Sequence, residues 1–260
     1  MEFRISDLSM VAHELKTPIN VISSTAQIVI KANNLEKLTK ERIDEYMQSI
    51  CHYCNKLELL TNNILDLSLD ERKSINCDYE TFNIEKFLKN FVKNLYPYAD
   101  KLNFTIDYIT KFNDCEFTCD YIKFERILLN LISNAVKYNN SSKKFVLIKA
   151  HDEKDVFVFS VKDNGVGIPK DMFEKILEPF YRIDSIETRK SNGCGLGLAI
   201  VKRFLNFLNG TLEIKSTVGI GSEFIIRLPK NHELSKKAQE PRLVYDSATS
   251  RIDIEMSNIM

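Results

Sequence analysis

The sequence predicts an α+β chain with two main parts: an antiparallel helical hairpin that forms a dimeric four-helix bundle, and a following region of alternating strands and helices. Two observations predict this division. Apolar residues recur at heptad spacing over residues 5–70, and the period changes after a charge-rich stretch near residue 75. The chain has 260 residues, enough for one large domain or two ordinary ones.

The first helix is predicted over residues 5–31. Its seam alternates spacings of four and three residues: Leu8, Ala12, Leu15, Ile19, Ile22, Ala26 and Val29. His13 lies beside this seam, so we expect it to be partly exposed. Thr17 shares the face of His13, whereas Glu14 is turned about 100° away. Pro18 lacks the amide hydrogen and clashes with the carbonyl four residues earlier, which predicts a kink.

The second helix is predicted over residues 40–70, with Thr39 as its N-cap. Its seam consists of Ile43, Met47, Ile50, Cys54, Leu57, Thr61 and Ile64, and is widened by Tyr46, Tyr53, Leu60 and Leu67. Each helix carries an apolar stripe wider than one partner helix would cover. Self-association into a homodimeric four-helix bundle is the natural way to bury it.

The second part alternates between period-2 and helical patterns. Strands are predicted at residues 79–82, 103–110, 116–119, 144–151, 156–162, 211–216 and 223–228, and helices at 84–102, 121–139 and 198–208. Asn83 and Asp120 are the expected N-caps of the first two of these helices. The predicted division is therefore a hairpin at 1–72, a second domain at 73–230 and a polar, poorly ordered or accessory tail at 231–260.

Composition excludes several classes of protein. Acidic and basic residues balance at 36 each, so no nucleic-acid partner is indicated. No apolar run reaches the length of a membrane span and the start lacks a signal peptide, which makes a cytoplasmic protein the default expectation. Cys51 and Cys54 form a C-x-x-C within the helical pattern, and Cys115 and Cys119 form a looser pair. Small core thiols are favoured over a zinc site.

One face of the helix at 121–139 carries Asn130, Asn134 and Lys137, at spacings of four and three. A neutral oxygen ligand beside an ammonium suits a magnesium triphosphate, and a solvated polar face is the alternative. Two glycine-rich loops follow. Asp163 begins the first, after an apolar strand, and Gly193 to Gly197 opens a helix, as in a phosphate-binding nest. Residues 173–190, between the loops, are interpreted as a mobile lid.

The order of these motifs resembles that of sensor histidine kinases. The segments that carry the resemblance are His-Glu-Leu-Lys-Thr-Pro at 13–18, the asparagine motif at 130–138, the glycine motif at 163–168, Pro-Phe-Tyr-Arg at 179–182 and the second glycine motif at 195–200. The resemblance spans roughly residues 5–230. It implies a dimerisation and phosphotransfer hairpin followed by a two-layer α/β sandwich that binds ATP.

The resemblance also implies roles for individual residues. His13 would be the phosphoacceptor and Glu14 its general base, while Arg182 would reach the γ-phosphate. Asn134 would bind Mg²⁺, with Asn130 and Lys137 near the phosphates. Tyr138 would flank the adenine and Asp163 would accept a hydrogen bond from its amino group. The remaining ATP-site residues would shape the pocket and lid: Gly165, Gly167, Ile168, Tyr181, Gly195, Leu196 and Gly197.

The implied activity is transfer of phosphate from ATP to His13 and on to an aspartate of a response regulator receiver domain. In related ATPases a glutamate four residues before the metal-binding asparagine activates water; here Asn130 takes that place, so hydrolysis should be slow. A catalytically weak dimeric scaffold or inhibitor of a regulator is the alternative.

Three questions stay open at this level. Thr17 either orients water for dephosphorylation of the regulator or is simply the helix residue before a proline. Cys194 replaces the usual Thr or Ser of its motif, and would be redox-sensitive if exposed. Because about a dozen residues precede His13, the chain is expected to be either a cytoplasmic fragment of a longer kinase or a short kinase regulated in trans.

Overall fold

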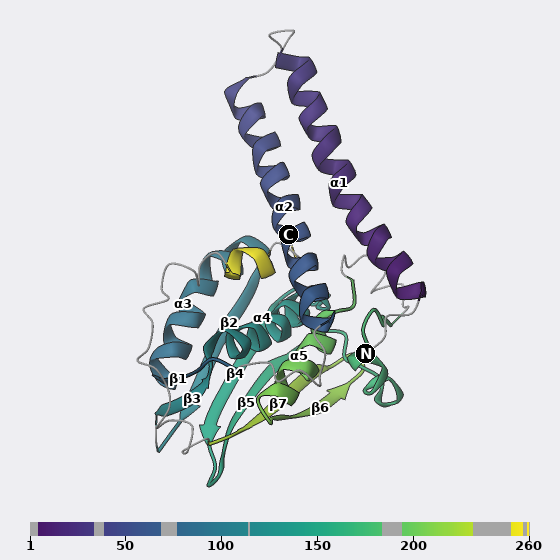
Figure 1. The fold of residues 1–260 in the computed structure, drawn as a ribbon. Helices are drawn as coiled ribbons and strands as arrows, with labels where there is room; N and C mark the ends of the chain where they lie inside the picture. The colour runs from purple at the N-terminus through teal and green to yellow at the C-terminus, as the bar shows by residue number, and fades with distance from the viewer. Residues whose placement is uncertain are drawn as a thin grey trace.

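The computed structural model describes residues 5–33, 39–68, 77–113, 115–183, 194–230, 251–256 and 259. Two long helices rise side by side from an α/β body, as Figure 1 shows. The two-part architecture predicted from the sequence is confirmed.

The hairpin consists of α1 (Ile5–Asn33) and α2 (Lys40–Ser68). Thr39 directly precedes α2, at the predicted N-cap position, and its hydroxyl oxygen accepts a hydrogen bond from the amide of Arg42 at 3.4 Å. The helix α1 continues through Pro18, which is buried. The kink at this proline stays a prediction.

A five-stranded sheet forms the base of the α/β body, in the order β2-β4-β5-β7-β6. Its strands are β2 (Phe104–Lys111), β4 (Lys144–Asp152), β5 (Val156–Asp163), β6 (Thr211–Thr217) and β7 (Gly221–Pro229). The β2–β4 pair is parallel and the other pairs are antiparallel. A second sheet pairs β1 (Tyr79–Asn83) with β3 (Glu116–Asp120).

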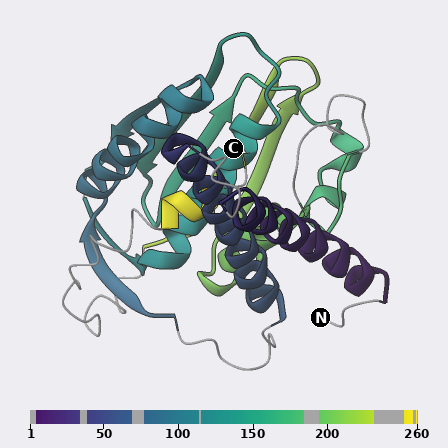
Figure 2. The same ribbon diagram turned by 90° about the horizontal axis from the view of Figure 1, so that it is seen from above.

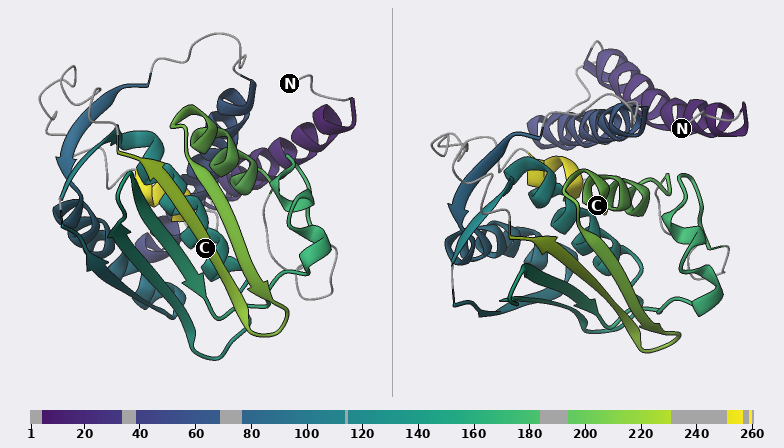
Figure 3. Two further views of the ribbon diagram at one scale, coloured as in Figure 1. Left: turned by 90° about the horizontal axis from the view of Figure 1, so that it is seen from below. Right: turned by 60° about the horizontal axis from the view of Figure 1, so that its bottom comes forward.

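Three helices complete this body: α3 (Ile84–Leu102), α4 (Tyr121–Lys137) and α5 (Gly197–Phe207). The predicted caps are present. The carboxamide of Asn83 accepts from the amide of Lys86 at 2.9 Å, and the carboxylate of Asp120 accepts from that of Lys123 at 3.0 Å. Figure 3 shows α4 and α5 as a layer between the sheet and the hairpin. The face of α4 that carries Asn130 is therefore turned away from the sheet, towards the hairpin.

Aromatic side chains fill the space between α4 and the sheet. Phe117, Phe124, Phe157 and Phe159 are fully buried, and the rings of Phe124 and Phe159 are 4.8 Å apart. The apolar side of α4 predicted from the sequence is also buried, at Ile127, Leu128, Leu131, Ile132 and Ala135. This packing fixes the rotation of α4, and so the direction of its polar face.

The lower end of α2 rests on the helical layer, so that the hairpin lies across the α/β body when seen from above (Figure 2). Arg126 of α4 forms an ion pair with Asp66 of α2, and donates to the Asn63 carboxamide oxygen at 2.9 Å. Arg203 of α5 donates to the main-chain oxygen of Leu67 at 3.1 Å. These bonds join the two parts at the base of the hairpin.

The structure differs from the expected polar tail at residues 251–256, which form a helical turn. Ile252 and Met256 are fully buried in the core. Their spacing of four places both on one helical face, which is enough to dock a short segment despite its polar composition. Residues 231–250 lie outside the described residues.

The cysteine prediction is partly wrong. Cys51 and Cys54 are exposed on α2 in the single chain. Cys119 is buried and Cys115 half-buried, as expected for core thiols. The described residues contain no group of three or more His, Cys, Asp or Glu side chains arranged to hold a metal ion. Nor does any described helix combine the length and apolarity needed to cross a bilayer.

Candidate functional site

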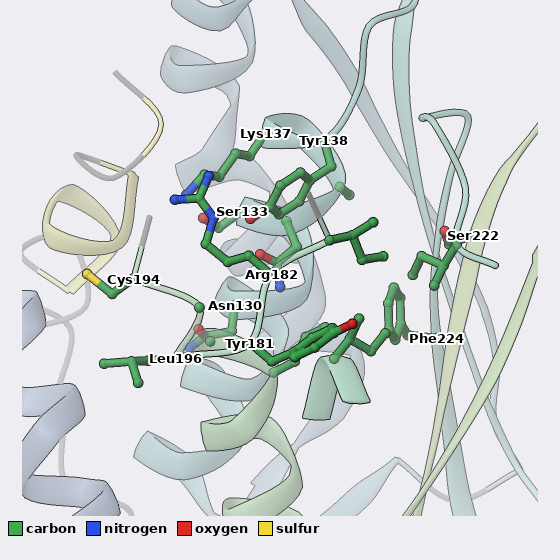
Figure 4. A pocket seen from close by; sticks show the side chains of 18 of the residues that line it. Asn130, Ser133, Lys137, Tyr138, Tyr181, Arg182, Cys194, Leu196, Ser222 and Phe224 are labelled. Carbon is green, nitrogen blue, oxygen red and sulfur yellow. The ribbon is translucent and has the colours of Figure 1, made fainter. Parts of the chain in front are cut away.

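A cavity of about 250 Å³ lies between α4, the loops that flank the lid, and the hairpin (Figure 4). It brings together most of the site residues predicted from the sequence: Glu14, Asn130, Asn134, Lys137, Tyr138, Asp163, Gly167, Ile168, Tyr181, Arg182, Gly195, Leu196 and Gly197. His13, Thr17 and Gly165 are predicted site residues that do not line it. Segments far apart in the sequence therefore form one concave site.

Two cationic side chains converge on this cavity. Figure 4 shows the side-chain ends of Lys137 and Arg182 close to each other. Burial, followed by the nearby Arg182 guanidinium, lowers the pKa of Lys137 to about 8. The Lys137 ammonium also lies 5.6 Å from the centroid of the Tyr138 ring. A desolvated ammonium beside a guanidinium at one end of a cavity favours a multiply charged anion there.

Asp163, at the end of β5, provides an acceptor on the cavity wall. Its Oδ1 atom accepts from the amide of Gly165 at 2.8 Å and from that of Ser222 at 3.2 Å. Burial raises the pKa of this carboxyl group, and the two amide bonds oppose that shift. Because Oδ1 is held by the main chain, Oδ2 is presented in a fixed direction for another donor.

Gly165 does not line the cavity, but it makes this arrangement possible. A Cβ atom at this position would lie 2.6 Å from the main-chain oxygen of Tyr138 and 2.9 Å from Oδ1 of Asp163. Gly167, two residues later, has a φ of 71°, and a Cβ there would lie 2.1 Å from the oxygen of Thr217. The loop after β5 therefore requires glycine at both positions.

The second glycine loop brings the start of α5 against α4. A Cβ atom on Gly197 would lie 2.7 Å from Oδ1 of Asn130. Leu196 precedes the helix, and no side chain of the described residues caps it. The first amides of α5 are thus available to an anion in the cavity, with the helix dipole favouring negative charge.

The helix α1 reaches the rim of the cavity through Glu14, whose Oε2 atom accepts from the thiol of Cys194 at 3.3 Å. His13, the preceding residue, is exposed. The hydroxyl of Thr17 donates to the main-chain oxygen of His13 at 3.4 Å. The rim of the cavity therefore includes the sequence neighbour of the exposed histidine.

The same contact bears on the suggested redox sensitivity of Cys194. The thiol is half-buried. Burial, with a further contribution from Glu14, raises its pKa to about 12. Because the thiolate is the reactive form, a thiol in this environment is a poor nucleophile. The redox sensitivity was suggested on the condition that Cys194 is exposed, and the structure does not meet this condition.

The lid is described as far as residue 183. Two short 3₁₀ turns, Lys170–Met172 and Lys175–Leu177, were not predicted. Phe180 is buried at a φ of 64°, and the Tyr181 hydroxyl donates to the sulfur of Met172 at 3.1 Å. Residues 184–190 of the predicted lid lie outside the described part of the chain, and its mobility stays a prediction.

Sequence reasoning missed two charged residues that line the cavity, Lys56 on α2 and Glu255 in the segment 251–256. Lys56 carries no local signal, because only the docking of the hairpin brings it to the site. Glu255 was more accessible to prediction, since Ile252 and Met256 flank it at helical spacing. Its contact with Asn130, by contrast, depends on tertiary structure.

Two protein-family models match the chain. Residues 8–72 match the model described as His Kinase A (phospho-acceptor) domain. Residues 119–232 match the model described as Histidine kinase-, DNA gyrase B-, and HSP90-like ATPase. The first corresponds to the hairpin and the second contains most of the cavity.

Individual proteins show the same similarity. The chain is 32% identical over 233 residues to the autoinducer 2 sensor kinase/phosphatase LuxQ of Vibrio vulnificus, covering 87% of this chain and 26% of that relative. Among solved structures, full-length ShkA in complex with AMPPNP is 27% identical, with a TM-score of 0.64, over 87% of this chain and 46% of that one. The Acinetobacter baumannii histidine kinase AdeS shares the fold at 23% identity, with a TM-score of 0.63, over 85% and 98% of the two chains.

Proposed function

The chain belongs to the sensor histidine kinases, and from this premise we propose that it is an ATP-dependent protein kinase that phosphorylates its own His13 and passes the phosphoryl group to an aspartate of a response regulator. One observation carries the proposal. A cavity lined by Lys137, Arg182, a fixed carboxylate and two glycine loops opens beside Glu14, the neighbour of His13.

ATP fits the chemistry of this cavity. We expect the carboxylate of Asp163 to accept from the adenine amino group and the ring of Tyr138 to lie against the base; both residues line the cavity. Lys137, Arg182 and the first amides of α5 are suited to the triphosphate. The structure of ShkA contains AMPPNP, an ATP analogue, in a relative that is 27% identical to this chain.

Magnesium is expected to enter with the nucleotide. The described residues provide no cluster of acidic side chains that would hold a divalent cation by itself. The Asn134 carboxamide beside Lys137 fits a magnesium ion that keeps most of its water and binds phosphate oxygens. Bound there, the ion would neutralise charge on the transferred phosphoryl group.

The transfer requires a neutral imidazole at His13. Its ring nitrogen would form the new P–N bond while the bond from the γ-phosphorus to the leaving oxygen of ADP breaks, and Arg182 would stabilise the charge on the phosphoryl oxygens. Glu14 would take the proton that the imidazole loses. Since Glu14 now accepts from Cys194, this role requires its side chain to turn towards His13.

Thr17 remains a candidate for the reverse reaction with the regulator. It is exposed one helical turn after His13, where a hydroxyl can orient water. LuxQ, which is similar to this chain, is described as both kinase and phosphatase. Because the Thr17 hydroxyl now faces the carbonyl of His13, the role requires a rotation about χ1.

Dimerisation through the hairpin fits its exposed apolar residues. In the single chain Met10, Ile19, Ile28, Ile30, Met47 and Leu65 are each more than 40% exposed. A second copy would cover such a surface, and the His Kinase A match supports the same assembly. The homodimer and the receiver domain of a regulator are the partners we propose.

The proposal is tested by incubating the purified chain with labelled ATP and Mg²⁺. We expect incorporation of label that is lost in acid and retained in alkali, as for a phosphoramidate. A His13→Gln variant should bind ATP with unchanged affinity and incorporate no label. Tight ATP binding without label on the unmodified chain would contradict kinase activity and favour a scaffold. Undiminished phosphate release by His13→Gln would instead indicate an ATPase.

A further inference from the structure

The segment 251–256 is anchored to the α/β body by contacts on two helices. Arg251 donates to the carboxylate of Glu125 on α4 at 2.5 Å, and Asp253 accepts from the hydroxyl of Tyr98 on α3. Ile252 and Met256 are buried at 1% and 0% exposure. In Figure 1 this segment is the yellow helix near α2 and α3. The anchors hold the intervening side chain of Glu255 in one position.

Glu255 is a buried acidic residue of the cavity wall that no step above uses. Its Oε1 atom accepts from Nδ2 of Asn130 at 3.3 Å. The charged groups that face it are Arg126 and Asp66. Burial raises the pKa of Glu255 to about 7, while Arg126 and the bond from Asn130 oppose that shift. Burying a carboxyl group lowers the stability of the fold unless a hydrogen bond or an oppositely charged partner compensates for the lost hydration.

The contact determines the orientation of the Asn130 amide. Its Nδ2 atom also donates to the main-chain oxygen of Arg126 at 2.9 Å, so two acceptors take its two hydrogens. With nitrogen and oxygen exchanged, the carbonyl oxygen would face both acceptors, which is unfavourable. The Oδ1 atom is therefore directed to the other side, where it lies 2.7 Å from the position that a Cβ atom on Gly197 would take.

We propose that Glu255 is a positioning residue of the nucleotide site: its carboxylate accepts one amide hydrogen of Asn130 and so directs the Asn130 carbonyl oxygen to the cavity at the start of α5. The proposal rests on the proposed function only through ATP binding. It gives the segment 251–256 a part in a site otherwise built from the hairpin and residues 130–224.

The test is a comparison of variants by equilibrium binding of a fluorescent ATP analogue, with and without Mg²⁺. Glu255→Ala removes the acceptor, and the affinity should fall about fivefold, the effect of one hydrogen bond. Glu255→Gln retains an acceptor oxygen without the charge, and should bind at least as tightly as the unmodified chain. Asp253→Asn alters the same segment away from Asn130 and should leave the affinity unchanged. Thermal unfolding of each variant verifies that it is folded.

A double-mutant cycle separates positioning from simple anchoring. In an Asn130→Ala background, Glu255→Ala should have no further effect, because the group that it positions is absent. A full fivefold loss in that background would overturn the proposal, as would equal losses in Asp253→Asn and Glu255→Ala. So would a Glu255→Gln variant as weak as Glu255→Ala, since charge or basicity would then be the property that matters.

Labelling of His13 is measured on the same samples, so the two proposals can fail separately. A chain that binds ATP through the coupled pair but does not label His13 would contradict the kinase proposal and support the role of Glu255. A chain that labels His13 but binds ATP with the same affinity in every Glu255 variant would support the kinase proposal and contradict the role of Glu255. A chain that does not bind ATP would contradict both.

Discussion

At the scale of single residues, Lys137 links the pH of the solution to the charge of the cavity. With a pKa of about 8, half of the Lys137 side chains have lost their proton at that pH and most have lost it at higher pH. Phosphate oxygens favour the ammonium form, so ATP binding at higher pH must first restore the proton. We therefore predict that ATP affinity falls as pH rises above 8, approaching tenfold per pH unit, in equilibrium binding of a fluorescent analogue.

The matched control is Lys137→Arg, because a guanidinium keeps its charge over the whole range. Its affinity should be lower at pH 7.5, since the larger head group fits the site less well, but it should vary little up to pH 9.5. An equally steep decline in this variant would assign the pH dependence to another group.

At the scale of helices, the contact of α2 with α4 has a measurable energy. Arg126 and Asp66 have side chains only 15% and 21% exposed. Removing the carboxylate with Asp66→Ala leaves a largely buried guanidinium with the Asn63 carboxamide as its remaining partner from α2. We predict a loss of about 2 kcal/mol in the free energy of unfolding, measured by denaturant titration.

An exposed ion pair in the same helix provides the comparison. Arg42 and Glu45 are 61% and 65% exposed. Glu45→Ala should change the free energy of unfolding by less than about 0.5 kcal/mol, because water and salt screen such pairs. If both variants behaved alike, the joint between hairpin and body would not depend on Arg126.

The elements themselves were largely readable from the sequence, and the exceptions share a cause. Asn83 and Asp120 cap helices that begin where predicted, because a cap and a regular apolar period are both local signals. The two 3₁₀ turns are too short to show a period, and in the segment 251–256 the spacing of Ile252 and Met256 is the one local sign of a helix. The face of α4 that carries Asn130 was predictable because it is a local helical pattern. The contact of Asn130 with Glu255 was not, because it depends on tertiary structure.

At the scale of the whole molecule, α1 of the chain reaches the cavity that we propose as the nucleotide site of the same chain. Glu14 lines a cavity formed by α4 and the lid of the same chain, and contacts Cys194 in the second glycine loop. In a homodimer either histidine is a conceivable acceptor, but this contact brings the helix of the chain's own histidine to the cavity. We therefore predict that each chain of the dimer phosphorylates its own His13.

Mixed dimers of two defective chains test this prediction. One chain carries His13→Gln and keeps the ATP site, while the other carries Asn134→Ala and keeps the histidine. Transfer within a chain leaves such a dimer unlabelled, because neither chain has both parts. Dimers of His13→Gln with the unmodified chain should be labelled, which verifies that the mixed assembly is active. Label on the Asn134→Ala chain would show transfer between chains, and the contact of Glu14 with Cys194 would then belong to a different state of the molecule from the one that reacts.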